Sequence, residues 1–129
     1  MLIYILVALG GAIGSIARLW LAVKVGLLTG LRFPWGTILV NILGSLVIGF
    51  VATFTGPSGR MVVPVEAQAF VMVGLCGGFT TFSAFSLQTL ELARDGRLLH
   101  AGANVMLSVV LCLSAVAIGH WLATLFGRT

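Results

Sequence analysis

The fold of this chain is decided by residues 74–86, which read GLCGGFTTFSAFS near the middle of an apolar segment from about residue 67 to 92. Glycine and β-branched threonine both weaken an α-helix, so residues 77–80 should interrupt an otherwise continuous helix. Inside a bilayer, backbone groups freed by a break are tolerated only where protein or a water-filled path satisfies them. Broken helices at this depth are a recurring way to build an ion site. We therefore expect a membrane helix that is broken at residues 77–80, close to the bilayer midplane.

The composition indicates an integral membrane protein. Of the 129 residues, 60% are hydrophobic and 8% are charged, and the mean hydropathy is +1.19. A soluble domain carries about 25% charged residues. The net charge of +4 is more readily explained by loop charges near anionic lipid than by a nucleic-acid surface. Cys76 and Cys112 both lie in apolar segments, and we expect small buried side chains there rather than a disulfide or a metal pair.

Hydropathy divides the chain into four spans, each close to the roughly 20 residues that cross a bilayer. They form a single all-α membrane domain, residues 1–129, with helices expected at about residues 2–24, 34–54, 65–93 and 98–126. The second span begins at Pro34, which suits the first turn of a helix. The third has Glu66 near its start, where the helix dipole favours an acid.

The distribution of basic residues between the two sides indicates how the chain inserts into the membrane. An even number of spans places both termini on one side of the membrane. Arg60, Arg128 and the terminal amine lie on that side, against four basic residues on the other, which are Lys24, Arg32, Arg94 and Arg97. This bias is weak by the positive-inside rule and permits insertion in both orientations. We therefore expect an antiparallel homodimer with dual topology, similar to an inverted-repeat transporter built from separate chains.

Polar side chains recur at intervals of four within two of the spans. The second span carries Thr37, Asn41 and Ser45, and the fourth carries Asn104, Ser108 and Cys112. Residues four apart share one helix face. Asn41 alone would most simply be a hydrogen bond between helices. Two polar stripes and a broken helix in so short a chain instead suggest a narrow hydrophilic track.

The first span holds an arginine at Arg18, preceded at intervals of four by Gly14 and Gly10. Small residues at this spacing make a groove for another helix. A membrane-embedded arginine is costly and is by default a functional-site hypothesis. The alternative is that Arg18 reaches the interface or binds loop carbonyls near the helix end, where it would still attract anions.

Phe82 and Phe85 lie in the second half of the third span. A phenylalanine pair at helical spacing is usually core, but aromatic rings have a positive edge that could face a small anion. The acids Glu66, Glu91 and Asp95 all lie at the ends of spans. Since a cation or proton path usually needs an intramembrane carboxylate, the residues favour an anion or a neutral solute.

Four motifs, which cover nearly the whole chain together with the length and the number of spans, are shared with one family. They are GGAIG at 10–14 leading to Arg18, PWGT at 34–37 leading to Asn41, the segment 44–49, and the run 74–86. At these residues the chain resembles the bacterial fluoride channels of the CrcB or Fluc family. The segment GGFTTFSAFS at 77–86 is the most specific part of the resemblance.

The resemblance implies an antiparallel homodimer with two fluoride pores in the bacterial inner membrane, which export fluoride passively without catalysis. Phe82 and Phe85 would contact fluoride and Asn41 would donate its amide, with lining hydroxyls from Thr37, Thr81, Ser83 and Ser108. Backbone carbonyls of Gly77 and Thr80 from both subunits would hold a structural Na⁺ ion, and Arg18 would be mainly structural. The chain departs from the family pattern at Gln88, Asn104 and Cys112.

Two other functions are compatible with a small four-span protein. A small multidrug transporter is also an antiparallel dimer, but it depends on a carboxylate in the first span, and residues 2–24 contain no acid. A structural subunit of a membrane complex would use the polar stripes only to hold helices together. Neither alternative accounts for the run at 77–86.

Overall fold

Four apolar helices dominate the computed structural model, which describes residues 1–57, 59 and 61–127. The segments that are long and apolar enough to cross a membrane are Leu2–Thr29, Trp35–Phe54, Val65–Arg94 and Leu98–Phe126. Within the described residues the chain contains helices and short connections but no strand. The expected all-helical architecture with four spans is therefore confirmed.

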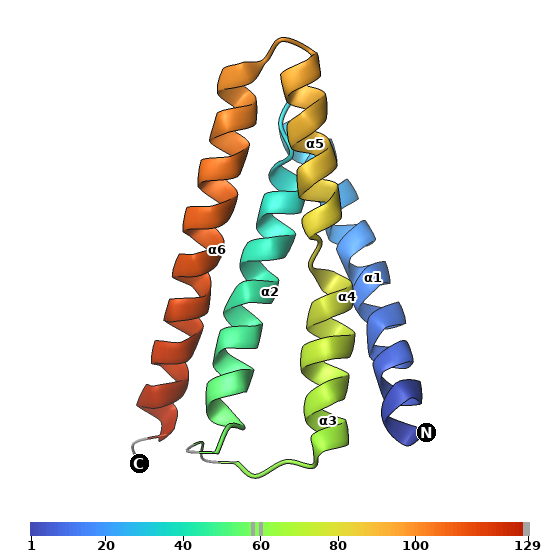
Figure 1. Ribbon diagram of the computed structural model, residues 1–129, viewed down its shortest axis with the longest axis vertical. Coiled ribbons are helices and arrows are strands. Elements are labelled where there is room, and N and C mark those ends of the chain that lie inside the picture. Colours follow the sequence, from blue (N-terminus) through green and yellow to red (C-terminus); the bar gives the residue numbers. More distant parts are fainter. Residues whose placement is uncertain (58, 60, 128–129) are drawn as a thin grey trace.

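The helices run along one long axis, as Figure 1 shows. Helix α1 comprises Leu2–Thr29, α2 Trp35–Phe54 and α6 Leu98–Gly127, and the third span is made of α3 (Val65–Ala69), the π-helix η1 (Phe70–Cys76), α4 (Gly77–Phe79) and α5 (Phe82–Arg94). Helix α1 continues five residues beyond the expected end at 24. It ends at Gly30, whose φ of 82° closes the last turn with a backbone bond to Gly26. Hydropathy marks the edge of the apolar span, whereas the glycine marks the end of the helix.

The third span is broken at Thr80 and Thr81 rather than over the whole of residues 77–80. Gly77 and Gly78 remain helical, while Thr80 has φ −88° and ψ 160° and Thr81 has φ −154° and ψ 117°. The expected start of the break was wrong, because Gly78 serves another purpose. A Cβ on Gly78 would lie 2.9 Å from the Cα of Gly11, so this glycine allows α1 to pass against α4. The extended backbone falls on the threonines, which prefer it.

A π-helix precedes the break, which the sequence pattern did not predict. In η1 the backbone hydrogen bonds join residues five apart instead of four, a geometry that is rare and often found at functional sites. Helix α1 packs on η1 through glycine, since a Cβ on Gly10 would lie 2.7 Å from the carbonyl oxygen of Phe70. Helices α2 and α6 likewise lie side by side, and a Cβ on Gly49 would lie 3.0 Å from the Cα of Val116. Glycines thus set the close approaches in both helix pairs.

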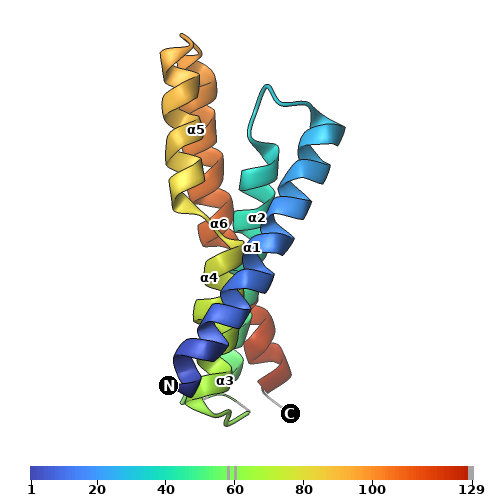
Figure 2. The ribbon, with the colours of Figure 1, turned by 90° about the vertical axis from the view of Figure 1, so that its right-hand side faces the viewer.

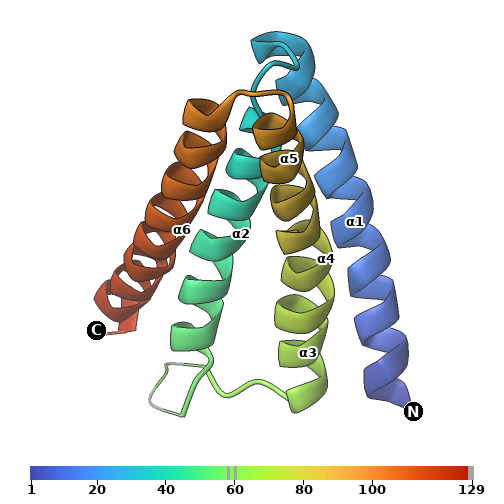
Figure 3. The same ribbon diagram turned by 45° about the horizontal axis from the view of Figure 1, so that its top comes forward.

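The two ends of the bundle differ. In Figure 2 the end with the α5–α6 turn separates into two pairs, α5 with α6 and α1 with α2. Figure 3, with this end brought forward, shows both chain termini at the opposite end, near the α2–α3 connection. Arg60 and Arg128, which entered the charge count, lie outside the described residues.

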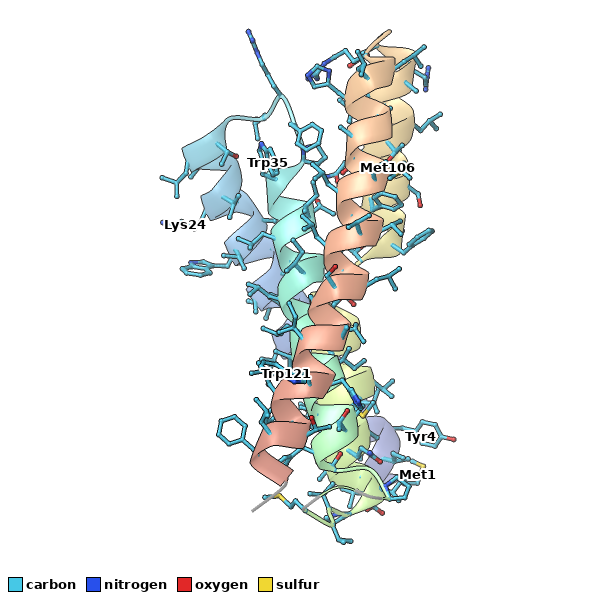
Figure 4. The ribbon with its side chains drawn as sticks, turned by 90° about the vertical axis from the view of Figure 1, so that its left-hand side faces the viewer. Met1, Tyr4, Lys24, Trp35, Met106 and Trp121 are labelled. Carbon is cyan, nitrogen blue, oxygen red and sulfur yellow. The ribbon has the colours of Figure 1, made fainter. Side chains whose placement is uncertain are left out.

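Aromatic residues mark both ends of the bundle. Figure 4 shows Trp35 towards one end and Tyr4 and Trp121 towards the other. All three side chains are exposed, by 42%, 74% and 58% respectively. Tryptophan and tyrosine are enriched where a bilayer meets water. Their positions agree with an apolar layer that lies between these two levels.

Candidate functional site

A pocket of about 390 Å³ lies beside the break in the third span. It is bounded by α2, the end of η1, the start of α5 and the middle of α6. Its polar lining comes from Asn41, Ser45, Thr80, Thr81 and Ser108, and its aromatic lining from Phe82 and Phe85. Five of the seven expected pore residues therefore meet in one pocket, and Ser45 and Thr80 join them.

Asn41 holds the broken backbone with both ends of its amide. Its Nδ2 donates to the carbonyl oxygen of Thr81 at 3.0 Å, and the backbone N–H of Thr81 donates to its Oδ1 at 2.7 Å. An asparagine amide has two N–H donors, so one remains for the pocket that Asn41 lines. Asn41 therefore combines two functions that the sequence left as alternatives, since it links two helices and still presents a donor.

The N-terminus of α5 is capped by Thr81. Its Oγ1 accepts from the backbone N–H of Ala84 at 3.2 Å and lies 3.2 Å from the hydroxyl of Ser83. Ser83 is exposed and does not line the pocket. The N-terminal end of a helix carries a partial positive charge, so α5 begins with a field that favours an anion beside the break.

The two phenylalanines differ sharply in exposure. Their ring centroids are 5.2 Å apart with planes tilted by 53°. Phe85 is 9% exposed, whereas Phe82 is 77% exposed. Phe85 is therefore buried in the wall of the pocket. Most of the surface of Phe82 is not covered by any other part of this chain.

The break releases backbone carbonyl groups from their helical partners. In a continuous helix the N–H of Thr81 would donate to Gly77 and that of Ala84 would donate to Thr80, because helical bonds join residues four apart. Here the first N–H donates to Asn41 and the second to the hydroxyl of Thr81. The carbonyl oxygens of Gly77 and Thr80 are thus among those that lose their helical donors at the break. Hard cations such as Na⁺ take oxygen ligands of this kind at the ends of half-helices.

A chain of hydrogen bonds beside the pocket connects α6 to α5. The hydroxyl of Ser108 donates to Oδ1 of Asn104 at 3.4 Å, and Nδ2 of Asn104 donates to Oγ1 of Thr89 at 2.8 Å. Thr89 in turn donates to the carbonyl oxygen of Phe85 at 2.7 Å. Asn104 is 1% exposed, so its amide is fully enclosed. Thr89 was not predicted as a site residue, although the amide of Asn104 needs such a partner inside an apolar helix pair.

Thr37 lies in a second pocket, of about 290 Å³, near the α1–α2 and α5–α6 connections. This pocket is bordered by charged and polar residues, among them Arg32, Arg97, Glu91 and Gln88. The Oε1 atom of Gln88 is buried and has no hydrogen-bond partner within the described part of the chain. Arg18 is half-buried on α1 and lines neither pocket. Thr37, Ser83 and Arg18 therefore do not line the pocket at the break, although the hydroxyl of Ser83 lies beside Thr81.

These features define a multi-pass membrane protein whose third helix is broken beside a pocket that offers hydrogen-bond donors and no carboxylate. The chain belongs to the CrcB-like family: the model described as "CrcB-like protein, Camphor Resistance (CrcB)" matches residues 5–120. The family resemblance inferred from the motifs is confirmed.

Curated relatives align over nearly their whole length. A protein of Rhodospirillum rubrum is 56% identical over 117 residues, which is 91% of each chain. A protein of Paramagnetospirillum magneticum is 55% identical over 128 residues, 99% of this chain and 100% of the relative. One of Methylocella silvestris is 54% identical over 120 residues, 93% of this chain and 92% of the relative. Each of these relatives is named a fluoride-specific ion channel, FluC.

Proposed function

We propose that this chain is a fluoride-selective ion channel of the bacterial membrane that lets fluoride leave the cytoplasm passively. The observation that carries the proposal is the pocket at the break, which presents amide and hydroxyl donors, ring edges and a helix N-terminus but no acid. Relatives that are 54–56% identical bear the name fluoride-specific ion channel. The family is one of channels, and the protein is not an enzyme.

Fluoride is small and tightly hydrated, so a selective path must replace its water with well-placed donors. The free N–H of Asn41 and the hydroxyl of Thr81 would supply hydrogen bonds, and the hydroxyl of Ser108 could supply another by turning away from Asn104. The ring edges of Phe82 and Phe85 would add a weak positive potential. Because these groups carry no full charge, an ion could enter without being held too tightly to leave.

The driving force would be the difference in pH across the membrane. Hydrogen fluoride crosses lipid as a neutral molecule and dissociates in the less acidic cytoplasm, where fluoride accumulates. A passive path then lowers its concentration without ATP. Thr37 in the second pocket would line the route nearer the membrane surface, and Ser83 would act by positioning Thr81.

Two copies of the chain would form the channel as an antiparallel homodimer. The support is the exposed ring of Phe82, which a single chain leaves uncovered at 77%. Gly77 is exposed as well. The freed carbonyls of Gly77 and Thr80 would bind Na⁺ together with the same groups of a second copy, and this ion would hold the two break regions together. Arg18, which is half-buried on α1, would have a structural function.

Reconstituted protein tests the proposed function. Liposomes loaded with potassium fluoride or potassium chloride should lose fluoride rapidly and retain chloride when a potassium ionophore balances the charge. An ion electrode measures both losses, and empty liposomes are the control. Protein that is folded and dimeric but releases neither ion would contradict the proposal and favour a structural subunit.

The proposed Na⁺ site predicts that the dimer depends on the cation present. When N-methylglucamine replaces Na⁺ during purification, the dimer should dissociate more readily and melt at a lower temperature. An ion that binds only the native state stabilises it by about 2.7 kcal/mol at 100 times its dissociation constant. Thermal melting and cross-linking yield in the two cations measure the effect. Equal melting and equal yield in both would argue against the site.

A further inference from the structure

The amide of Asn104 lies between two hydroxyl groups behind the wall of the pocket at the break. Its Nδ2 donates to Oγ1 of Thr89 at 2.8 Å, and its Oδ1 accepts from the hydroxyl of Ser108 at 3.4 Å. Ser108 lines the pocket, whereas Asn104 and Thr89 do not. Because Asn104 is 1% exposed, its amide depends on partners within the protein rather than on water.

In this arrangement the hydroxyl of Ser108 is turned towards the wall. A serine hydroxyl has a single hydrogen, so while it donates to Asn104 it presents only lone pairs to the pocket. Lone pairs repel an anion, and Ser108 must turn its hydrogen to the pocket before it can bind one. If the amide stayed as it is, its buried Oδ1 would then lack a donor, which is unfavourable.

A half-turn of the amide keeps every group paired. The oxygen and NH₂ ends of an asparagine side chain are so alike in size that exchanging them needs no new space. Nδ2 would then donate to Oγ of Ser108, and the hydroxyl of Thr89 would donate to Oδ1. Thr89 now donates to the carbonyl oxygen of Phe85 at 2.7 Å. This carbonyl is also the helical acceptor for the N–H of Thr89, so it would keep a partner.

We propose that Asn104 is a positioning residue whose amide turns over when fluoride enters the pocket, so that Ser108 can donate its hydrogen to the ion. This inference rests on the proposed function and assigns a part in it to a residue that does not line the pocket. The turned amide would also strengthen the bond from Ser108 to fluoride, because hydrogen bonds in a chain polarise one another.

NMR spectroscopy tests the turn directly, because Asn41 and Asn104 are the only asparagines of the chain. Full-length protein labelled with ¹⁵N-asparagine is titrated in detergent with sodium fluoride or sodium chloride, and the side-chain NH₂ signals are followed. Fluoride, and not chloride, should shift the signals of both residues. Asn104→Leu assigns the two sets of signals, since one set is missing from its spectrum.

Ser108→Ala should leave the Asn104 signals in place and abolish their response to fluoride. The matched control is Ser114→Ala, which removes an exposed hydroxyl of the same helix that lines neither pocket and should preserve the response. Asn104 signals that do not respond to fluoride in the wild type, or that still respond in Ser108→Ala, would overturn the inference. Efflux from liposomes decides the proposed function separately, so efflux by a wild type whose Asn104 signals do not respond refutes only the turn of the amide.

The affinity for fluoride provides a second test. Asn104→Leu removes both the donor and the acceptor, so the fluoride concentration that half-saturates the shift of the Asn41 signals should rise about three- to tenfold, the effect of one hydrogen bond. In the Ser108→Ala background the same replacement should have no further effect, because the amide acts through that hydroxyl. An equal rise in both backgrounds, or none in the wild type, would contradict the proposal. Thermal melting shows whether each variant is folded, and if Asn104→Leu is not, the Ser108→Ala spectra decide.

Discussion

Replacing Asn41 by aspartate is expected to lower fluoride efflux by at least about 100-fold. The carboxylate would place a negative charge in the pocket where fluoride is proposed to bind. Two unit charges about 4 Å apart repel by about 4 kcal/mol at the effective dielectric constant of a protein site, and each 1.4 kcal/mol is a factor of about ten. The variant also loses the N–H that remains free for the ion. Ion-electrode measurements on liposomes would give the rate.

A second variant, Asn41→Leu, distinguishes the effect of the added charge from the effect of losing the hydrogen bonds at the break. Aspartate can still accept the N–H of Thr81, whereas Asn41→Leu loses both of the hydrogen bonds that hold the break. We expect the leucine variant to melt at a lower temperature than the aspartate variant. A folded, dimeric Asn41→Asp protein with fluoride efflux equal to that of the wild type would refute a pore function for this residue.

The largest effect on stability is expected from Gly14→Ala. The new Cβ would collide with the carbonyl oxygen of Leu75 and lie 2.8 Å from the backbone nitrogen of Phe79. Backbone atoms cannot turn aside as a flexible side chain can, so α1 would have to move away from η1 and α4. Overpacking of this kind costs about 1–3 kcal/mol, and occasionally more. We expect about 3 kcal/mol here, measured as a loss in the free energy of unfolding in detergent at fixed protein concentration.

The neighbouring Gly11→Ala is the matched control. It adds the same methyl group to the same helix, but nothing lies within 4 Å of its Cβ position. Since alanine favours a helix over glycine by up to about 1 kcal/mol, this variant should be as stable as the wild type or slightly more so. Equal destabilisation by Gly11→Ala and Gly14→Ala would show that the close contact of α1 with the broken span is not what supports the fold.

The sequence is sufficient to predict a membrane protein with four transmembrane spans. Its low content of charge and four long apolar segments require a membrane environment, because no soluble core could bury so much apolar surface. The motif at 77–86 indicated the family, and this resemblance implied pore positions for Asn41, Thr81 and Phe85, which the structure brings into one pocket. These features are local or periodic, so they can be read along the chain.

Tertiary structure alone decided what each polar residue contacts. Whether Asn41 joins helices or faces a pocket depends on Thr81, 40 positions away, and the structure shows both. The exact site of the break also depends on packing, because α1 passes closely against the helical Gly78 and the extended backbone falls on Thr80 and Thr81. The partners of Asn41 and the position of the break both depend on which helices pack together and how closely. These contacts join residues far apart in the sequence, so no single segment predicts them.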